Sequence, residues 1–154
     1  MSIIYLKKTG KMTNVNIYSA NKFSTEETLT ECWCDFETYD GGDDKDKDSK
    51  IELIYSIKYP ASGISRVIAL SPMDSHGRFA DGTSNKVDLN VQGVVRLSDI
   101  LSSVGTFTLK FEPKGDDTWK FHYTLRMKFN EGTLLDVKAG SYKQVTDQTR
   151  QMQE

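Results

Sequence analysis

Apolar and polar side chains alternate along much of the chain, most regularly in residues 119–129. Apolar residues occupy every second position of this segment without a break, which is the period of a strand with one buried face and one exposed face. Residues 105–112 alternate in the same way, and the turn-forming residues 113–117 separate the two segments. The pattern predicts two strands joined as a β-hairpin with a loop longer than two residues.

Shorter alternating segments predict the remaining strands. They lie at residues 15–17, 28–36, 51–59, 66–70, 87–91 and 133–137. Helix signals are few: residues 98–103 are predicted to form one turn, with Ser98 as the N-cap. Residues 141–154 are rich in Gln, Thr and Lys, and we expect a polar tail or a short helix there.

These elements predict an all-β fold. An antiparallel β-sandwich of the jelly-roll or immunoglobulin-like kind, or a flattened barrel, with about eight or nine strands would bury one face of each alternating segment. The length of 154 residues suits a single domain. We expect that domain to span residues 1–140 and the polar tail or helix to follow it.

Composition excludes several classes of protein. The chain contains seven Phe, seven Tyr and two Trp residues, enough bulky side chains to build a core, so a disordered chain is not expected. Its net charge of −2 argues against general nucleic-acid binding, which usually requires a basic domain. No apolar run is long enough for a transmembrane segment.

The first residues and the two cysteines indicate a reducing compartment. The start of the chain lacks the basic segment and apolar stretch of a secretory signal, so we expect a cytoplasmic protein or leaderless export. Cys32 and Cys34 are too close in sequence for ordinary disulfide geometry and are predicted to be free thiols. A zinc site would need two further ligands. Only His76 and His122 are available, so packing in the core is favoured.

Two long loops are predicted, at residues 38–50 and 71–86, and long loops in a compact domain are often functional or mobile. The first contains Asp44, Asp46 and Asp48 at alternate positions, a weak candidate for calcium because clustered carboxylates suit hard cations. The spacing does not match an EF-hand, and lysines are interleaved with the acids. A solvated, mobile hairpin tip without a bound cofactor is therefore the favoured interpretation.

The second loop carries a candidate ligand-binding set. Polar and charged side chains surround one aromatic residue there, the mixture that a small-ligand or sugar pocket needs. The set comprises Asp74, His76, Arg78, Phe79 and Asp81. The alternative is structural, with Asp and Gly forming turns and Phe79 filling the edge of the core.

The polar face of the predicted hairpin is a candidate anion-binding surface. Its members are Lys110, Lys120, His122, Arg126 and Lys128. A basic stripe of this kind could meet phosphate, sulfated glycan or anionic lipid. The alternative is an ordinary solvent face whose lysines discourage strand pairing between molecules. The alternation places no aromatic residue on this face, which counts against single-stranded nucleic acid.

Catalysis finds no support in the motifs. The chain lacks a Gly-x-Ser-x-Gly elbow, a phosphate-binding glycine loop and an HExxH helix. We predict a non-catalytic, lectin-like recognition protein that binds a carbohydrate or a protein surface through loops 38–50 and 71–86. A self-assembling structural or pore-forming β protein, such as a virion component or toxin subunit, is the first alternative. An enzyme of unknown type is the second. The sequence leaves a homo-oligomer open, and a closed ring or large particle would favour the assembly alternative.

Overall fold

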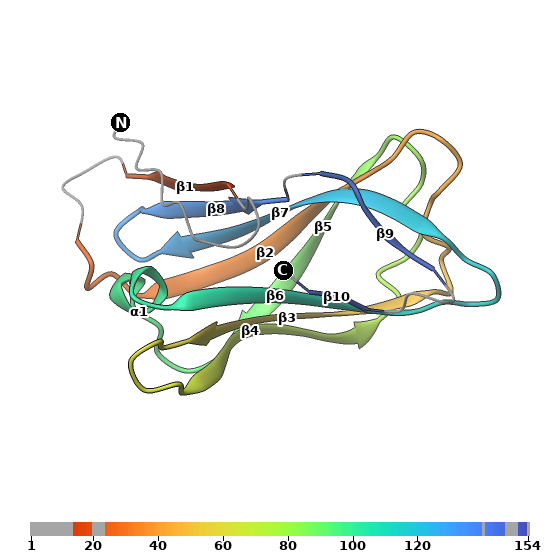
Figure 1. The fold of residues 1–154 in the computed structure, drawn as a ribbon. Coiled ribbons are helices and arrows are strands. Elements are labelled where there is room, and N and C mark those ends of the chain that lie inside the picture. Colours follow the sequence, from red (N-terminus) through yellow and green to blue (C-terminus); the bar gives the residue numbers. More distant parts are fainter. Residues whose placement is uncertain (1–13, 20–23, 140, 147–150, 154) are drawn as a thin grey trace.

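The computed structural model describes residues 14–19, 24–139, 141–146 and 151–153. It is an all-β fold of two antiparallel layers with one short helix (Figure 1). The elements are β1 (Asn14–Tyr18), β2 (Leu29–Thr38), β3 (Lys50–Lys58), β4 (Ser65–Asp74), β5 (Ser84–Val91), α1 (Leu97–Leu101), β6 (Val104–Glu112), β7 (Trp119–Phe129), β8 (Leu134–Lys138), β9 (Lys143–Val145) and β10 (Gln151–Gln153). The predicted β-sandwich or flattened barrel is confirmed.

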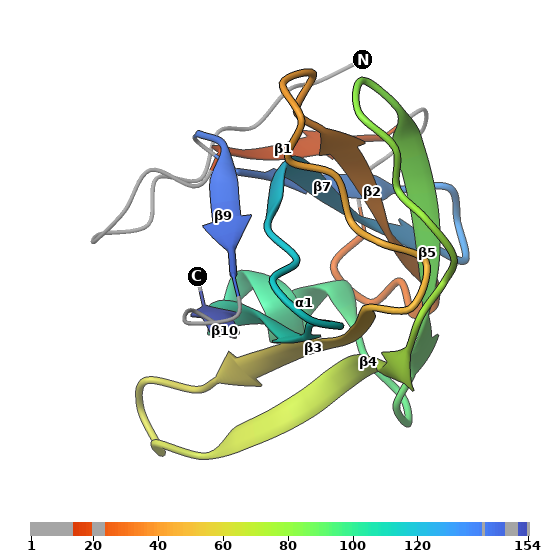
Figure 2. The ribbon, with the colours of Figure 1, turned by 90° about the vertical axis from the view of Figure 1, so that its right-hand side faces the viewer.

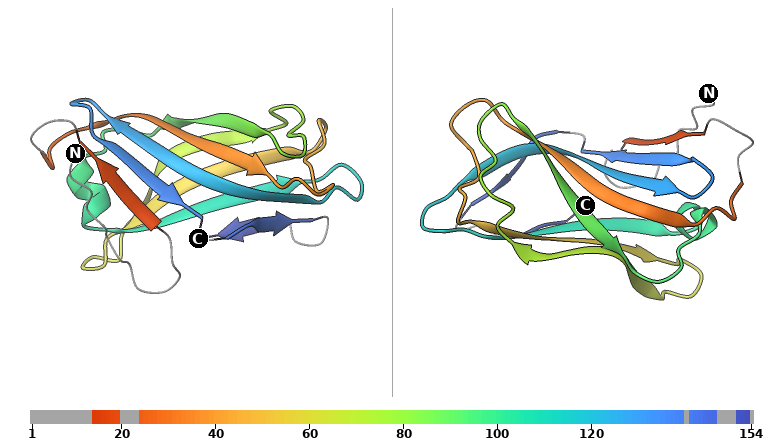
Figure 3. Two further views of the ribbon diagram at one scale, coloured as in Figure 1. Left: turned by 90° about the horizontal axis from the view of Figure 1, so that it is seen from above. Right: turned by 180° about the vertical axis from the view of Figure 1, so that it is seen from behind.

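One strand, β5, connects the two layers. The strand order is β1-β8-β7-β2-β5-β4-β3-β6-β10, with β9 also paired to β7. Residues 84–89 of β5 pair with β2, whereas residues 90 and 91 pair with β4. We call the layer of β1, β8, β7, β2 and β9 the upper sheet and the layer of β4, β3, β6 and β10 the lower sheet, as they lie in Figure 1. Figure 3 shows the same two layers from above and from behind.

The hairpin predicted over residues 105–129 is wrong, although both strands exist. β6 pairs with β3 and β10 in the lower sheet, and β7 pairs with β2, β8 and β9 in the upper sheet. The connection between them crosses from one layer to the other, so the two alternating faces pack against each other. The rings of Phe107 and Tyr123 meet across the core at 4.7 Å between centroids.

Alternation correctly identified the buried face of β7. Its six apolar residues are all at most 1% exposed, while the polar residues between them are at least partly exposed. Near one end of the sandwich, Trp119 stacks on Phe121 at 4.1 Å and lies 5.0 Å from Phe36. This aromatic cluster closes the core beneath the long loops.

The predicted helical turn at 98–103 is confirmed as α1. Its N-cap is Arg96 rather than Ser98, because the Asp99 carboxylate accepts a hydrogen bond from the Arg96 main-chain N–H at 2.8 Å. In the described part of the chain, no helix is long and apolar enough to span a membrane.

The prediction of a polar tail or helix after residue 140 is wrong where the structure describes this segment. β9 extends the upper sheet beside the start of β7, and its Val145 is fully buried. β10 pairs with β6, and Met152 packs against the core. One apolar side chain anchors each of these strands, Val145 fully buried and Met152 partly buried. Strands of three residues are too short for alternation to reveal.

Both cysteines are buried free thiols on the inner face of β2, as predicted. Burial raises the pKa of Cys32 to about 12 and also raises that of Cys34. Among the described residues, no group of three or more His, Cys, Asp or Glu side chains is placed to hold a metal ion.

Candidate functional site: the loop end of the sandwich

The two long loops meet at one end of the sandwich, beside the β6–β7 connection (Figure 2). Lys45 and Phe79 exchange main-chain hydrogen bonds, N to O at 3.1 Å in one direction and 3.0 Å in the other. The Gly82 N–H also donates to the Thr38 carbonyl at 3.1 Å. We call the surface of residues 38–50, 74–83 and 112–118 the loop end. Loop 38–50 crosses from β2 in the upper sheet to β3 in the lower sheet, so the predicted hairpin tip is wrong.

A fully buried lysine holds the loop end together. The Lys45 ammonium group donates to three main-chain carbonyls: Asp46 at 2.9 Å, Ser49 at 2.8 Å and Gly77 at 2.7 Å. Its Nζ also lies 4.9 Å from the centre of the Phe79 ring. The first two carbonyls belong to loop 38–50 and the third to loop 71–86. One cation therefore fixes both loops at once.

Burial and neighbouring carboxylates act on Lys45 in opposite directions. Burial lowers the pKa of Lys45 to about 8, because a dry environment disfavours the charged amine. Asp117, Asp46, Asp48 and Asp74 counter this shift by attraction, with Asp117 contributing most. These carboxylates come from all three segments of the loop end, so the ammonium group is the centre of its electrostatics.

Further bonds join the same segments around Lys45. The Arg78 guanidinium contacts the Asp44 carboxylate at 2.6 Å, linking the two long loops. The Asp46 N–H donates to Asp117 at 3.1 Å, which adds the β6–β7 connection. The Gly42 N–H donates to Asp81 at 2.8 Å. These bonds join the three segments of the loop end into one surface.

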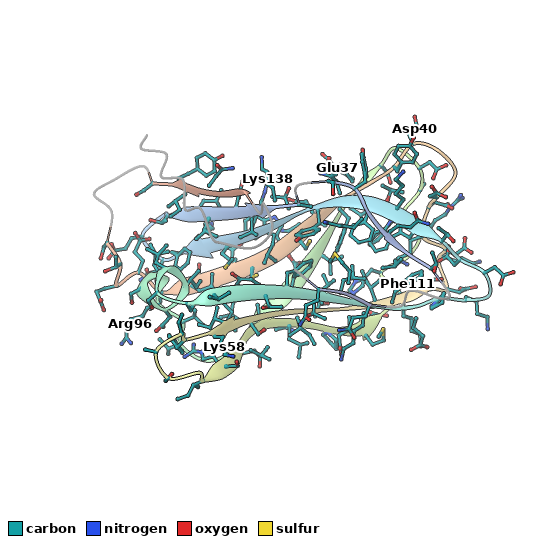
Figure 4. All side chains as sticks on the ribbon, viewed as in Figure 1. Glu37, Asp40, Lys58, Arg96, Phe111 and Lys138 are labelled. Carbon is teal, nitrogen blue, oxygen red and sulfur yellow. The ribbon has the colours of Figure 1, made fainter. Side chains whose placement is uncertain are left out.

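The loop end is strongly acidic. Its three segments contain ten Asp and Glu residues against five Lys and Arg residues, although the whole chain carries a net charge of only −2. Lys45 is buried and Arg78 is paired with Asp44, so much of the positive charge is already engaged. Exposed carboxylates include Asp40, which Figure 4 shows at this end.

The structure separates the five residues predicted as a ligand site. Phe79 is 2% exposed and packs in the aromatic cluster, 5.4 Å from Trp119, so it offers no plate to a sugar. Its alternative role as a plug at the edge of the core is confirmed. Arg78 and Asp81 make the loop cross-links described above.

The other two members of the predicted set, Asp74 and His76, lie where β4 ends and the chain turns toward β5. The Asp74 carboxylate accepts a hydrogen bond from the Ser75 N–H at 2.7 Å. His76 has a φ of 53°, in the left-handed region, and its Nε2 lies 3.5 Å from the Ser71 hydroxyl. Burial lowers the pKa of His76, partly offset by Asp74. These two residues support the turn rather than a pocket.

Asp44, Asp46 and Asp48 do not converge on a common ligand set, since Asp44 is bound to Arg78 while Asp46 and Asp48 are exposed. Lys45 was not predicted as a site residue, since it is one of the lysines interleaved with the acids of loop 38–50. A lysine within a run of aspartates gives no signal that its stem is buried. The ammonium group places one positive charge among these acids.

The predicted basic stripe is also divided. Lys110 lies on β6 in the lower sheet, bound to Glu52 at 2.9 Å, whereas the other four residues lie on β7 in the upper sheet. Acids on neighbouring strands oppose two of those four. Lys128 contacts Glu31 at 3.2 Å, and Arg126 lies 3.5 Å from Asp35 and 3.6 Å from Asp136. Burial raises the pKa of Asp136, with Arg126 acting against that shift.

Lys120 and His122 contact exposed aromatic residues that lie next to the ends of neighbouring strands. The alternation within a single strand did not reveal these contacts. Tyr39, just after β2, and Tyr142, just before β9, are 36% and 45% exposed. Their rings meet edge to face at 5.2 Å. The Lys120 Nζ lies 4.2 Å from the Tyr39 ring centre, and the His122 ring lies 4.6 Å from that of Tyr142. We call these four residues the tyrosine shelf.

Comparison with known proteins finds a likeness in fold. No family model matches the sequence, and no curated protein matches it. Part of a solved structure of the alpha toxin from Clostridium absonum resembles this fold, with a TM-score of 0.51 and 16% sequence identity. The match covers 83% of this chain and 34% of the toxin chain, so this chain spans about a third of that protein's length.

Proposed function

We propose that this protein is a non-catalytic recognition module that binds a basic protein surface through the loop end. The observation that carries the proposal is the convergence of both long loops into one acidic surface fixed by Lys45. A surface that is already ordered loses less conformational entropy on binding. Its excess of carboxylates would attract and orient a partner rich in lysine and arginine.

Between the two ligand classes expected from the sequence, a protein fits the loop end better than a carbohydrate. The burial of Phe79 removes the aromatic ring of loop 71–86 on which a sugar could have stacked. The reactive groups of this end are also engaged in holding it together. The Lys45 ammonium, the Arg78–Asp44 pair and the Asp117 carboxylate all make structural contacts, and this supports binding rather than catalysis.

The binding test uses two fluorescent peptides of about twelve residues, one alternating Lys with Ser and the other Glu with Ser. Three exposed loop-end acids are neutralised together, by Asp40→Asn, Glu112→Gln and Asp116→Asn. The control removes three exposed acids elsewhere, by Glu26→Gln, Asp88→Asn and Glu131→Gln. Both variants change the net charge by the same amount and leave the bonds around Lys45 intact.

The Lys peptide should bind the parent protein, and the loop-end variant should weaken that binding by about tenfold or more. The control variant should change the affinity by less than about twofold. Raising the salt concentration should also weaken binding, because exposed charges are screened. Equal losses in the two variants, or tighter binding of the Glu peptide, would contradict the proposal.

A self-assembling protein or toxin subunit is the second candidate, and a different surface favours it. Four exposed aliphatic residues belong to the end of the lower sheet near α1: Ile64, Val67, Val94 and Val104, with exposures of 43–65%. Exposed apolar patches often mark contacts between proteins. The likeness to part of an alpha toxin agrees with this candidate in architecture only.

A further inference from the structure

We propose that the tyrosine shelf, together with the polar hollow beside it, is a binding site for a neutral sugar. This site lies on the outer face of the upper sheet and goes beyond the function proposed for the loop end. It consists of an exposed aromatic ring, held by its neighbours, next to a small hollow lined with hydrogen-bonding groups.

Strand register brings the shelf residues together. Glu37 on β2 is paired with His122 on β7, and the Tyr39 N–H donates to the Lys120 carbonyl at 2.9 Å. On the other side of β7, Phe121 is paired with Lys143, so Tyr142 lies next to His122. Figure 4 shows Glu37 on the outer side of the upper sheet.

Tyr39 acts as a fixed wall. The Lys120 ammonium lies over its ring at 4.2 Å, a favourable cation–π distance. The Gly41 backbone packs so closely against the same ring that a Cβ atom at this position would clash with it. Tyr39 is thus held between a cation and a glycine.

Tyr142 is the more exposed ring of the pair and is the surface on which a sugar would stack. The centroids of the Tyr39 and His122 rings lie 5.2 and 4.6 Å from its own, with interplanar angles of 77° and 67°. These two contacts set the orientation of the ring before a ligand binds. The apolar C–H face of a pyranose matches such a ring, and its hydroxyl groups then need polar partners at the side.

The polar partners line a hollow that shares His122 with the shelf. Its volume is about 200 Å³, below the roughly 300–1,000 Å³ typical of pockets for drug-sized ligands, so it suits a single sugar ring. The lining residues are Asp35, Glu37, Ser84, His122, Tyr123, Thr124 and Arg126. They offer carboxylates, hydroxyl groups, an imidazole and a guanidinium, the groups that hydrogen-bond to sugar hydroxyls.

Charge balance favours a neutral sugar over an acidic one. Asp35 and Glu37 contribute two negative charges, and Lys120 and Arg126 contribute two positive charges. Arg126 is held between Asp35 and Asp136, and Lys120 is held over Tyr39. No excess positive charge faces the hollow from these residues, so a carboxylated or sulfated sugar has no electrostatic advantage.

The test is an NMR titration of the ¹⁵N-labelled protein with glucose, galactose, mannose and N-acetylglucosamine, and with glucuronic acid as a charged comparison. At least one neutral sugar should shift the amide signals of Lys120, His122 and Tyr142 in a saturable manner. Tyr142→Ala should abolish the shifts, and Tyr142→Phe should preserve the dissociation constant within about threefold, because the stacking ring remains. Tyr18→Ala, a half-exposed tyrosine of the same sheet, is the matched control.

The salt dependence of binding distinguishes this site from the loop end. Raising NaCl from 50 to 500 mM should change the sugar affinity by less than about twofold, since no net charge is neutralised. The loop-end variant should bind the sugar normally, so the two proposals can fail independently. The assignment would be overturned if no neutral sugar shifts these signals, or if only glucuronic acid does so in a saturable manner. It would also be overturned if Tyr142→Ala responds like the parent protein, or if the Lys peptide shifts these signals instead.

Discussion

At the scale of single residues, Lys45 has a larger structural role than its place in a charged loop suggests. The side chain is buried, and its ammonium group donates to three main-chain carbonyls, of which that of Ser49 is buried as well. A buried charge persists in a protein only when it is paired or fully hydrogen-bonded. The hydrogen-bond acceptors of Lys45 are main-chain carbonyls of the two loops, so this buried charge determines the shape of both loops.

Lys45→Met is therefore expected to lower the free energy of unfolding by about 3 kcal/mol, since an unpaired buried polar group costs about 1–3 kcal/mol. Methionine retains most of the apolar stem and removes the donor. Chemical denaturation measures the change. Lys47→Met, at an exposed position of the same loop, is the control and should cost less than about 0.5 kcal/mol. Similar values for the two variants would contradict the role of Lys45.

The buried thiols give a second prediction. Burial raises the pKa of Cys32 to about 12 and also raises that of Cys34, so the reactive thiolate is scarce at pH 8. Alkylation by iodoacetamide at pH 8 should be at least about a hundredfold slower in the folded protein than in urea. Because the unfolded thiols lose their protons at lower pH than the folded ones, the thiols' contribution to stability decreases above about pH 9. Rapid alkylation of both thiols in the folded state would contradict this burial.

The residue-level predictions from sequence succeeded where a side chain's role follows from its strand. The six apolar residues of β7 are buried, and the two thiols face the core. The predictions from sequence failed where the role of a side chain depends on contacts with another segment of the chain. The burial of Lys45 depends on its hydrogen bond to the Gly77 carbonyl, and the burial of Phe79 depends on its packing against Trp119. No local pattern contains that information.

At the scale of elements, alternation revealed the strands but not their partners. Two consecutive strands show the same alternation whether they pair as neighbours in one sheet or lie in opposite layers and pack face to face. The connection 113–118 is long enough to cross between layers, so β6 and β7 face each other instead of pairing. The predicted basic stripe failed for this reason, because Lys110 depended on the hairpin.

A double-mutant cycle at Phe107 and Tyr123 tests this arrangement of β6 and β7. The two rings lie 4.7 Å apart across the core, so replacing each by Leu should reveal a coupling energy of about 0.5–1.5 kcal/mol. Denaturant unfolding of the four proteins gives the value. A control cycle between Phe107→Leu and Lys86→Ala, at an exposed position of β5, should be additive. Absence of coupling between Phe107 and Tyr123 would argue against the crossing.

At the scale of the whole molecule, the fold brings distant segments to one end. Loops 38–50 and 71–86 and the β6–β7 connection are well separated in sequence, yet they share hydrogen bonds and one buried cation. That two long loops would exist followed from their composition. Their meeting at one end could not be predicted from composition, because it depends on the strand order, in which β5 links the two sheets.

Solution mass distinguishes recognition from self-assembly. The recognition module is expected to remain a monomer of 17.4 kDa in light scattering at every concentration. A larger particle would instead favour assembly. In that case Ile64→Asp with Val94→Asp should restore the monomer, because these are the most exposed aliphatic side chains in the described part of the chain. A ring or filament that withstands this double change would exclude the aliphatic patch as its interface.

Amide hydrogen exchange distinguishes two long loops that form one surface fixed by Lys45 from two loops that open independently. The Lys45 and Phe79 amides donate to each other's carbonyls at 3.1 and 3.0 Å. In the parent protein both should exchange as slowly as amides within the sheets, and in Lys45→Met both should exchange at least about tenfold faster as the loops open locally. Fast exchange of these amides in the parent, or equal protection in the variant, would contradict a single surface fixed by Lys45.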